Sequence, residues 1–105
     1  MAKPNENARR LYEIQMTRFA GLGWRDLAYD RRGGVYETLS LAYAVYTARL
    51  LDLPPDPRVL ASLLACQDPQ TRDFHTHFTA DQPRLVDPNV ETTSIALLAL
   101  HVSSH

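Results

Sequence analysis

The sequence has few of the features that stabilise a fold covalently or direct a chain to a membrane. Its 105 residues include one cysteine, Cys66, so no disulfide can form within the chain. Neither terminal region has an apolar run long enough to cross a bilayer, and the N-terminus MAKPNENARR is too polar for a signal peptide. We therefore expect one cytoplasmic domain, residues 1–105, with no membrane partner and with stability that comes from packing and association.

The sequence also has no excess of positive charge. The formal net charge is −1, and the three arginines nearest the N-terminus, Arg9, Arg10 and Arg18, are offset by Glu6 and Glu13. A nucleic-acid-binding face needs a net basic patch. We therefore expect no nucleic-acid partner, and a small helical regulator with a basic recognition helix is disfavoured.

Apolar residues at helical spacing are abundant. The pattern predicts a first helix over residues 6–20, capped by Asn5 and stopped by a left-handed Gly21. A second helix over residues 35–51 is apolar on nearly all sides, which predicts burial on nearly all sides. The buried stripe predicted for the first helix consists of Leu11, Tyr12, Ile14, Met16 and Phe19.

Prolines mark the boundaries of two further helices. Pro54-Pro55 ends the second helix, and Asp56-Pro57 supplies a cap followed by proline at the first position of a third helix, which ends near Gln67. Asp87-Pro88 predicts the same start for a fourth helix, again apolar nearly all round. No segment alternates with period two long enough for a strand, so the expected fold class is all-α with four main helices.

The second and fourth predicted helices begin with nearly the same residues. At a period of 54 residues four positions are identical and one is similar: Glu37 with Glu91, Thr38 with Thr92, Ser40 with Ser94, Ala42 with Ala96, and Leu41 with Ile95. The order of amphipathic helix, long polar loop and apolar helix also repeats. We infer two α-hairpin repeats, about residues 6–52 and 56–102, with the apolar helices inside.

This pattern resembles the (α/α) toroid proteins. The phrase VETTSIALLAL, residues 90–100, is similar to the inner-helix repeats of squalene and hopene cyclases and of protein prenyltransferases. The segment 65–78 resembles the glutamine-to-aromatic motif of the cyclases: Gln67 is in place, while Asp73 and Phe74 stand where glycine and tryptophan are expected. The acidic run of the cyclases and the zinc ligands of the prenyltransferases are missing, so the resemblance implies architecture and not chemistry.

A closed toroid needs more hairpins than the two found here. The chain is therefore expected to be a toroid-like fragment completed by other copies or by a larger toroid partner, or else a small helical bundle closed on itself. Its abrupt end after an apolar helix favours a piece of a longer protein. Two nearly apolar inner helices in so small a chain would leave apolar area exposed unless something covers it. The alternative is an enzyme or enzyme fragment of the toroid class, acting on an isoprenoid or a carbohydrate.

Both long loops, residues 21–34 and 68–87, join an outer helix to an inner one, so we expect them on one rim of the molecule. Loops on a rigid scaffold commonly carry function, and this rim would bind a small-molecule ligand. The candidate ligand-binding residues are Trp24, Tyr29, Asp30, Arg31, Glu37, Phe74, His75, His77 and Glu91. For the enzyme alternative, Phe78 is added to the pocket lining, and no catalytic residue is assigned.

Several of these residues also have a purely structural interpretation. A glutamate such as Glu37 or Glu91 near a helix N-terminus is favoured by the helix dipole, and Trp24 fits a lid on a small core. The arginines of the loops are expected to pair with Asp26, Asp30 and Asp73.

The spacing of His75 and His77 alone is too little for a metal site, so we predict no metal and no cofactor. Cys66 lies among apolar residues of the third helix, where a buried, inert thiol is expected rather than a nucleophile.

Overall fold

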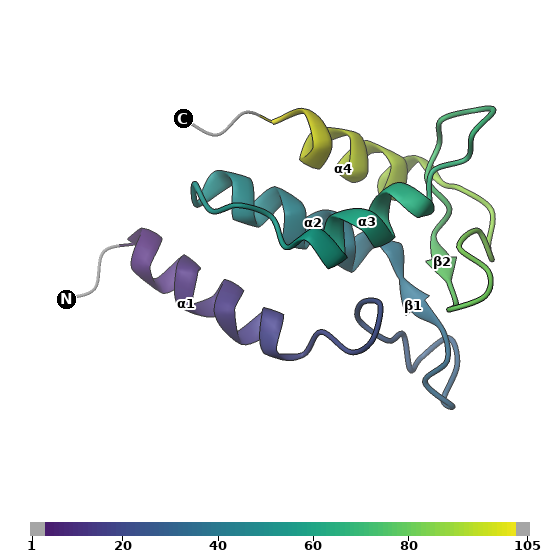
Figure 1. Ribbon diagram of the computed structural model, residues 1–105, viewed down its shortest axis with the longest axis horizontal. Helices are drawn as coiled ribbons and strands as arrows, with labels where there is room; N and C mark the ends of the chain where they lie inside the picture. The colour runs from purple at the N-terminus through teal and green to yellow at the C-terminus, as the bar shows by residue number, and fades with distance from the viewer. Residues whose placement is uncertain (1–3, 103–105) are drawn as a thin grey trace.

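The computed structural model describes residues 4–102 and has four helices with one very short two-stranded ladder. The elements are, in order, α1 (Pro4–Thr17), β1 (Tyr36–Glu37), α2 (Thr38–Leu50), α3 (Pro57–Ala65), β2 (His77–Phe78) and α4 (Val90–His101). The helices α2 and α4 lie side by side and run in the same direction, while α1 and α3 run the opposite way (Figure 1). The predicted all-α class and four-helix count are confirmed.

The core is centred on α2, which packs most extensively against α4 and then against α3. Small side chains, Ala42, Ala96 and Ala99, are completely buried and allow α2 and α4 to approach closely. The largest fully buried side chains are Phe74, Leu41, Leu63, Val45 and Val59. Phe74 comes from the second long loop, so this loop is anchored in the core.

The start of α3 follows the prediction. Asp56 is the N-cap, and its carboxylate accepts a hydrogen bond of 2.8 Å from the backbone N–H of Arg58, with Pro57 in the first turn. The Arg58 guanidinium returns to Asp56 and also lies 4.5 Å from the centre of the Phe19 ring. This corner therefore joins α3 to the end of α1. The helix ends at Ala65, two residues before the predicted Gln67.

The start of α4 differs from the prediction. Pro88 pairs with His75 in an isolated antiparallel bridge, which keeps the chain extended past Asp87-Pro88. Asn89 is the N-cap instead, and its side chain accepts a hydrogen bond of 2.8 Å from the N–H of Thr92. The dipeptide Asp-Pro thus begins α3 at Asp56-Pro57 but only precedes α4 at Asp87-Pro88. At the second position the bridge between Pro88 and His75 keeps the backbone extended.

The boundaries of α1 and α2 also differ. The helix α1 begins at Pro4, one residue before the predicted cap Asn5, whose side chain lies outside the described part of the chain. It ends at Thr17, and Gly21, with φ +70°, forms a later turn rather than the helix stop. The helix α2 begins at Thr38 instead of residue 35 because Tyr36–Glu37 pair antiparallel with His77–Phe78. Periodicity could not detect strands of two residues.

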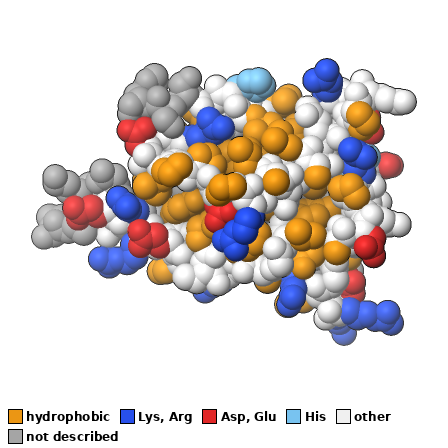
Figure 2. All heavy atoms as spheres, in the orientation of Figure 1, with side chains coloured by type: hydrophobic (Ala, Val, Ile, Leu, Met, Phe, Trp, Pro, Cys, Tyr) orange, Lys and Arg blue, Asp and Glu red, His pale blue; other side chains and the backbone are white. Residues whose placement is uncertain are grey.

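The predicted burial of the helices is only partly correct. Leu11 and Ile14 of α1 are 68% and 44% exposed, whereas Met16 and Phe19 pack against the core and Tyr12 is half-buried beside the proline turn. The inner helices are not covered on every side: Tyr43 and Leu50 of α2 are exposed, as are Val90, Leu97 and Leu98 of α4. On the face drawn in Figure 2, apolar side chains fill the middle and most charged groups lie around the edge.

Candidate functional site

Both long loops and the first turns of α2 and α4 meet at one end of the molecule, as the sequence predicts (Figure 1). The short turn between α2 and α3 lies at the opposite end. The buried residues Thr38 and Thr92 lie in the first turns of the two inner helices, at equivalent positions of the repeat. The ladder between β1 and β2 holds the first loop against the second at this rim.

The first loop is held in place by Trp24. Its indole N–H donates a hydrogen bond of 3.0 Å to the carbonyl of Gln15 at the end of α1, and its ring meets Phe19 edge-on at 5.4 Å. Trp24 is only 7% exposed. It is a lid that fastens α1 to the core, which is the structural interpretation, and no surface remains for stacking a ligand.

A hydrogen-bonded pair joins the two loops across 51 positions of sequence. The Nε2 atom of His77 lies 2.9 Å from Oδ2 of Asp26, and Oδ1 of Asp26 accepts a hydrogen bond of 3.1 Å from the N–H of Tyr29. The hydrogen bond from His77 is the main reason that the pKa of Asp26 is lowered from 3.8. The Tyr29 ring stacks on the His77 imidazole with centroids 4.5 Å apart.

The second nitrogen of His77 contacts Thr76. The Nδ1 atom lies 2.9 Å from Oγ1 of Thr76. Ionised Asp26 can only accept, so Nε2 carries a proton, and in the neutral imidazole Nδ1 accepts from the Thr76 hydroxyl. A chain of hydrogen bonds therefore runs from Thr76 through His77 to Asp26.

The hydrogen bonds from Thr76 through His77 to Asp26 border a small polar hollow of about 160 Å³ between the starts of α2 and α4. Three carboxylates face it, together with imidazole, amide and hydroxyl groups. The lining residues are Asp26, Glu37, Leu39, Thr76, His77, Asn89, Glu91 and Thr92. The hollow is smaller than a typical drug-sized pocket, which begins near about 300 Å³, and it suits a small polar molecule or one projecting group of a larger one.

Glu37 and Glu91 reach the hollow from equivalent positions of the repeat. Glu91 is in the first turn of α4 as predicted, but Glu37 precedes α2 as its N-cap residue in β1. The Glu37 carboxylate makes no cap hydrogen bond to the backbone and instead accepts one of 2.9 Å from the Ser40 hydroxyl. Glu37 therefore lies at the N-terminus of α2, where the helix dipole favours a carboxylate, but its side chain does not cap the helix.

The remaining predicted site residues lie elsewhere. Phe74 is fully buried in the core. Asp30 accepts a hydrogen bond of 2.9 Å from the backbone N–H of Arg32, and Arg31 is exposed on the loop. Of the nine candidates, Glu37, His77 and Glu91 line the hollow and Tyr29 supports His77 from behind.

His75 and His77 have different partners. The Nε2 atom of His75 lies 3.1 Å from Asp68, and its Nδ1 atom lies 2.8 Å from the carbonyl of Val86, so this residue closes the second loop on itself. Within residues 4–102, His, Cys, Asp and Glu form no group of three or more that could hold a metal. The two histidines therefore do not converge on one ion.

Cys66 has the environment predicted for an inert thiol. It is completely buried at the C-terminal cap of α3, and burial raises the pKa of its thiol to about 11. The nearby Thr38 hydroxyl opposes this rise only weakly. Nucleophilic chemistry at Cys66 is not supported.

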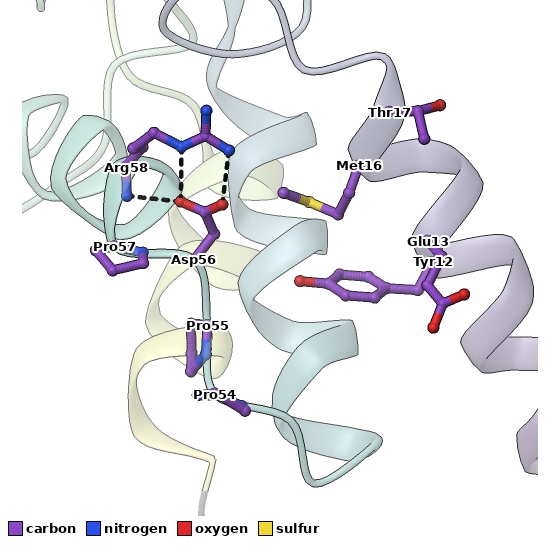
Figure 3. A pocket seen from close by; sticks show the side chains of 9 residues that line it. All are labelled: Tyr12, Glu13, Met16, Thr17, Pro54, Pro55, Asp56, Pro57 and Arg58. Atoms are coloured by element: carbon purple, nitrogen blue, oxygen red, sulfur yellow. Dashed lines mark hydrogen bonds and ion pairs between the residues drawn. The ribbon is translucent and has the colours of Figure 1, made fainter.

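Two open grooves lie along α1, away from the rim. One, of about 640 Å³, separates α1 from the proline turn, with Tyr12 and Met16 pointing toward Asp56 and the prolines (Figure 3). The other, of about 390 Å³, lies between α1 and α2. No helix within residues 4–102 has both the length and the apolar character required to cross a membrane.

Asp26, Thr76 and Asn89 line the hollow but are not among the candidate ligand-binding residues predicted from the sequence. Asp26 was expected to pair with an arginine and pairs with His77 instead. No pattern in the sequence joins these two residues, because they lie in different loops and are 51 positions apart. Comparison of the chain with protein-family models, curated proteins and solved structures found no match.

Proposed function

We propose that this chain is a cytoplasmic helical module, built like two hairpins of an (α/α) toroid, that is completed by self-association or by a larger toroid partner. The observation that supports the proposal is the uncovered surface of the inner helices. Tyr43 and Leu50 of α2 and Leu97 and Leu98 of α4 are all more than a third exposed. Removing such apolar area from water contributes about 25 cal/mol per Å², so association is favourable.

The solution mass tests this proposal. We expect light scattering on a sizing column at micromolar concentration to give a mass above the 11.9 kDa of one chain, rising with concentration. Circular dichroism of the same fractions should show a folded helical protein. A fully folded monomer over the whole concentration range would contradict self-association.

The polar hollow at the rim supports a second part of the proposal, a site for a small ligand. Asp26, Glu37 and Glu91 surround it with negative charge and acceptor oxygens, and His77 adds a titratable ring. Carboxylates bind hydroxyl and ammonium donors strongly. The class of ligand that fits is therefore a polyhydroxylated or cationic small molecule.

Binding can be followed at the His77 ring by NMR titration with a neutral monosaccharide and, separately, with an alkyl diamine. We expect a saturable shift of the His77 resonances with one of them and little change at His75. The Glu91→Gln variant should weaken binding, and Glu13→Gln, which changes an exposed carboxylate on α1, is the matched control. Absence of any saturable shift with both probes would contradict a site of this class.

One observation favours the enzyme alternative. A hydrogen-bonded chain from Thr76 through His77 to Asp26 borders the same hollow as two further carboxylates, Glu37 and Glu91. Paired carboxylates that act as acid and base are what glycoside hydrolysis requires. Of the aromatic residues predicted to line the enzyme's pocket, Trp24, Phe74 and Phe78 are buried in the core, so they offer no apolar surface to an isoprenoid. Of the two substrate classes, a carbohydrate is therefore the better fit.

Chromogenic glycosides test the alternative directly. We expect any turnover by the wild type to fall at least tenfold in Asp26→Asn and in His77→Gln, because acid–base assistance contributes factors of about 10² to 10⁴. His75→Gln removes the neighbouring imidazole and should retain the activity. Turnover that survives both site substitutions would assign it to another protein in the preparation.

A further inference from the structure

The groove between α1 and α2 is lined only by uncharged side chains. They are Ala8, Leu11, Tyr12 and Gln15 from α1, and Ser40, Tyr43, Ala44 and Thr47 from α2. Leu11 and Tyr43 stand at its open side, 68% and 47% exposed. The two helices run antiparallel (Figure 1), and the groove lies between residues 8–15 of α1 and residues 40–47 of α2.

The outer face of α4 is a matching ridge. Its exposed residues are Val90, Glu91, Ser94, Leu97, Leu98 and His101, which recur at the spacing of one helical face and have their charged members at the two ends. From Thr92 to Leu100 the helix has no charged residue. A charge in the middle of a partner's contact face would lose its hydration in the uncharged groove and would find no opposite charge there. The middle of the α4 ridge is uncharged, so docking it does not carry this desolvation cost.

We propose that the occupant of the groove is a second copy of this chain: α4 of one copy lies in the α1–α2 groove of the next, in a head-to-tail contact. This inference rests on the self-association proposed above and specifies its interface. Within one chain α2 already packs against a parallel α4 through small residues, Ala42, Ala96 and Ala99. The groove offers a second α4 a place beside the same α2, with Ala44 on its floor.

The docked helix is expected to run parallel to α2, because this direction repeats the arrangement of α2 and α4 within one chain. The charged residues of the docked helix, Glu91 in its first turn and His101 in its last, then lie toward the two ends of the uncharged groove.

Because the contact joins two different surfaces, it can be tested by complementation. Leu98→Glu places a charge on the ridge and leaves the groove intact, and Leu11→Glu does the reverse. Both sites are exposed and glutamate is a good helix former, so both variants should fold, as circular dichroism will verify. We expect each variant alone to have the mass of one chain, and an equimolar mixture to give twice that mass.

Leu64→Glu is the matched control. Leu64 lies on α3, outside both surfaces, and is 48% exposed, close to the 47% of Leu98. This variant should associate like the wild type. If all three variants associate like the wild type, self-association stands and this interface is wrong. If the two interface variants are monomeric but their mixture stays monomeric, the contact is not head-to-tail. A monomeric wild type would overturn both proposals.

The direction of α4 can be tested with cysteine pairs, since the native Cys66 is buried. In the parallel arrangement Ser94 lies near the Gln15 end of the groove. The double variant Gln15→Cys with Ser94→Cys should form intermolecular disulfides under mild oxidation, several-fold faster than Ala8→Cys with Ser94→Cys. Faster cross-linking of the Ala8 pair would overturn the parallel arrangement.

Discussion

The two hairpins of the chain differ in how firmly their outer helices are held. The second outer helix, α3, buries Val59 and Leu63 completely against the core. The first, α1, packs Met16 against the core but leaves Leu11 and Ile14 in solvent. The difference shows that a broad apolar stripe predicts a helix but does not predict how many of its side chains are buried within the same chain.

The largest expected effect comes from shortening the same residue type in each outer helix. Leu63→Ala should lower the free energy of unfolding by about 2–5 kcal/mol, because it leaves a cavity in a close-packed core. Leu11→Ala should change it by no more than about 0.5 kcal/mol, because Leu11 is already solvated. Urea unfolding at a concentration where the protein is monomeric measures both values. Equal losses would mean that α1 is packed as firmly as α3.

The two Asp-Pro pairs provide a smaller effect. Asp56 caps α3, whereas Asn89, and not Asp87, caps α4. Asp56→Ala and Asn89→Ala should each cost about 1 kcal/mol of unfolding free energy, and Asp87→Ala a few tenths at most. Thermal unfolding of the three variants ranks them. A loss in Asp87→Ala as large as that in Asn89→Ala would contradict the observed start of α4.

The smallest expected effect concerns the pair that joins the two rim loops. The pKa of Asp26 is lowered from 3.8, so its ionised form stabilises the fold. This contribution is fully present above the unfolded pKa and is lost as pH falls through the lower folded pKa. Unfolding measured from pH 7 to pH 3 should therefore show a shallower acid loss for Asp26→Asn than for the wild type. Parallel curves for the two proteins would mean that the pair does not contribute to stability.

Much of the architecture could be predicted because its signals are local. The start of α3 needs only Asp56, Pro57 and the backbone of the next residues. The apolar residues that predict α2 and α4 lie within each helix and occur at matching positions of the repeat. The order of helices and long loops was also sufficient to place both loops at one end. Local signals failed where a distant segment intervened, as when His75 paired with Pro88 and displaced the start of α4.

The candidate site was predicted less completely. Glu37, Glu91 and His77 were recognised by type and position, but Asp26 gains its role only from a partner 51 residues away. The prediction was wrong for two aromatic residues. Trp24 and Phe74 are of types that commonly line ligand pockets, but both are buried in the core. A side chain's type shows what it can contact, and only the packing decides what it does contact.

By itself the sequence determined the helical class, the two-hairpin repeat and the rim, since each depends on periodicity, capping and loop length along the chain. Tertiary structure alone decided which apolar faces are covered, which aromatic residues enter the core, and that His77 meets Asp26. These outcomes depend on contacts between segments far apart in sequence, whose free energies compete with one another and are not encoded in any single stretch.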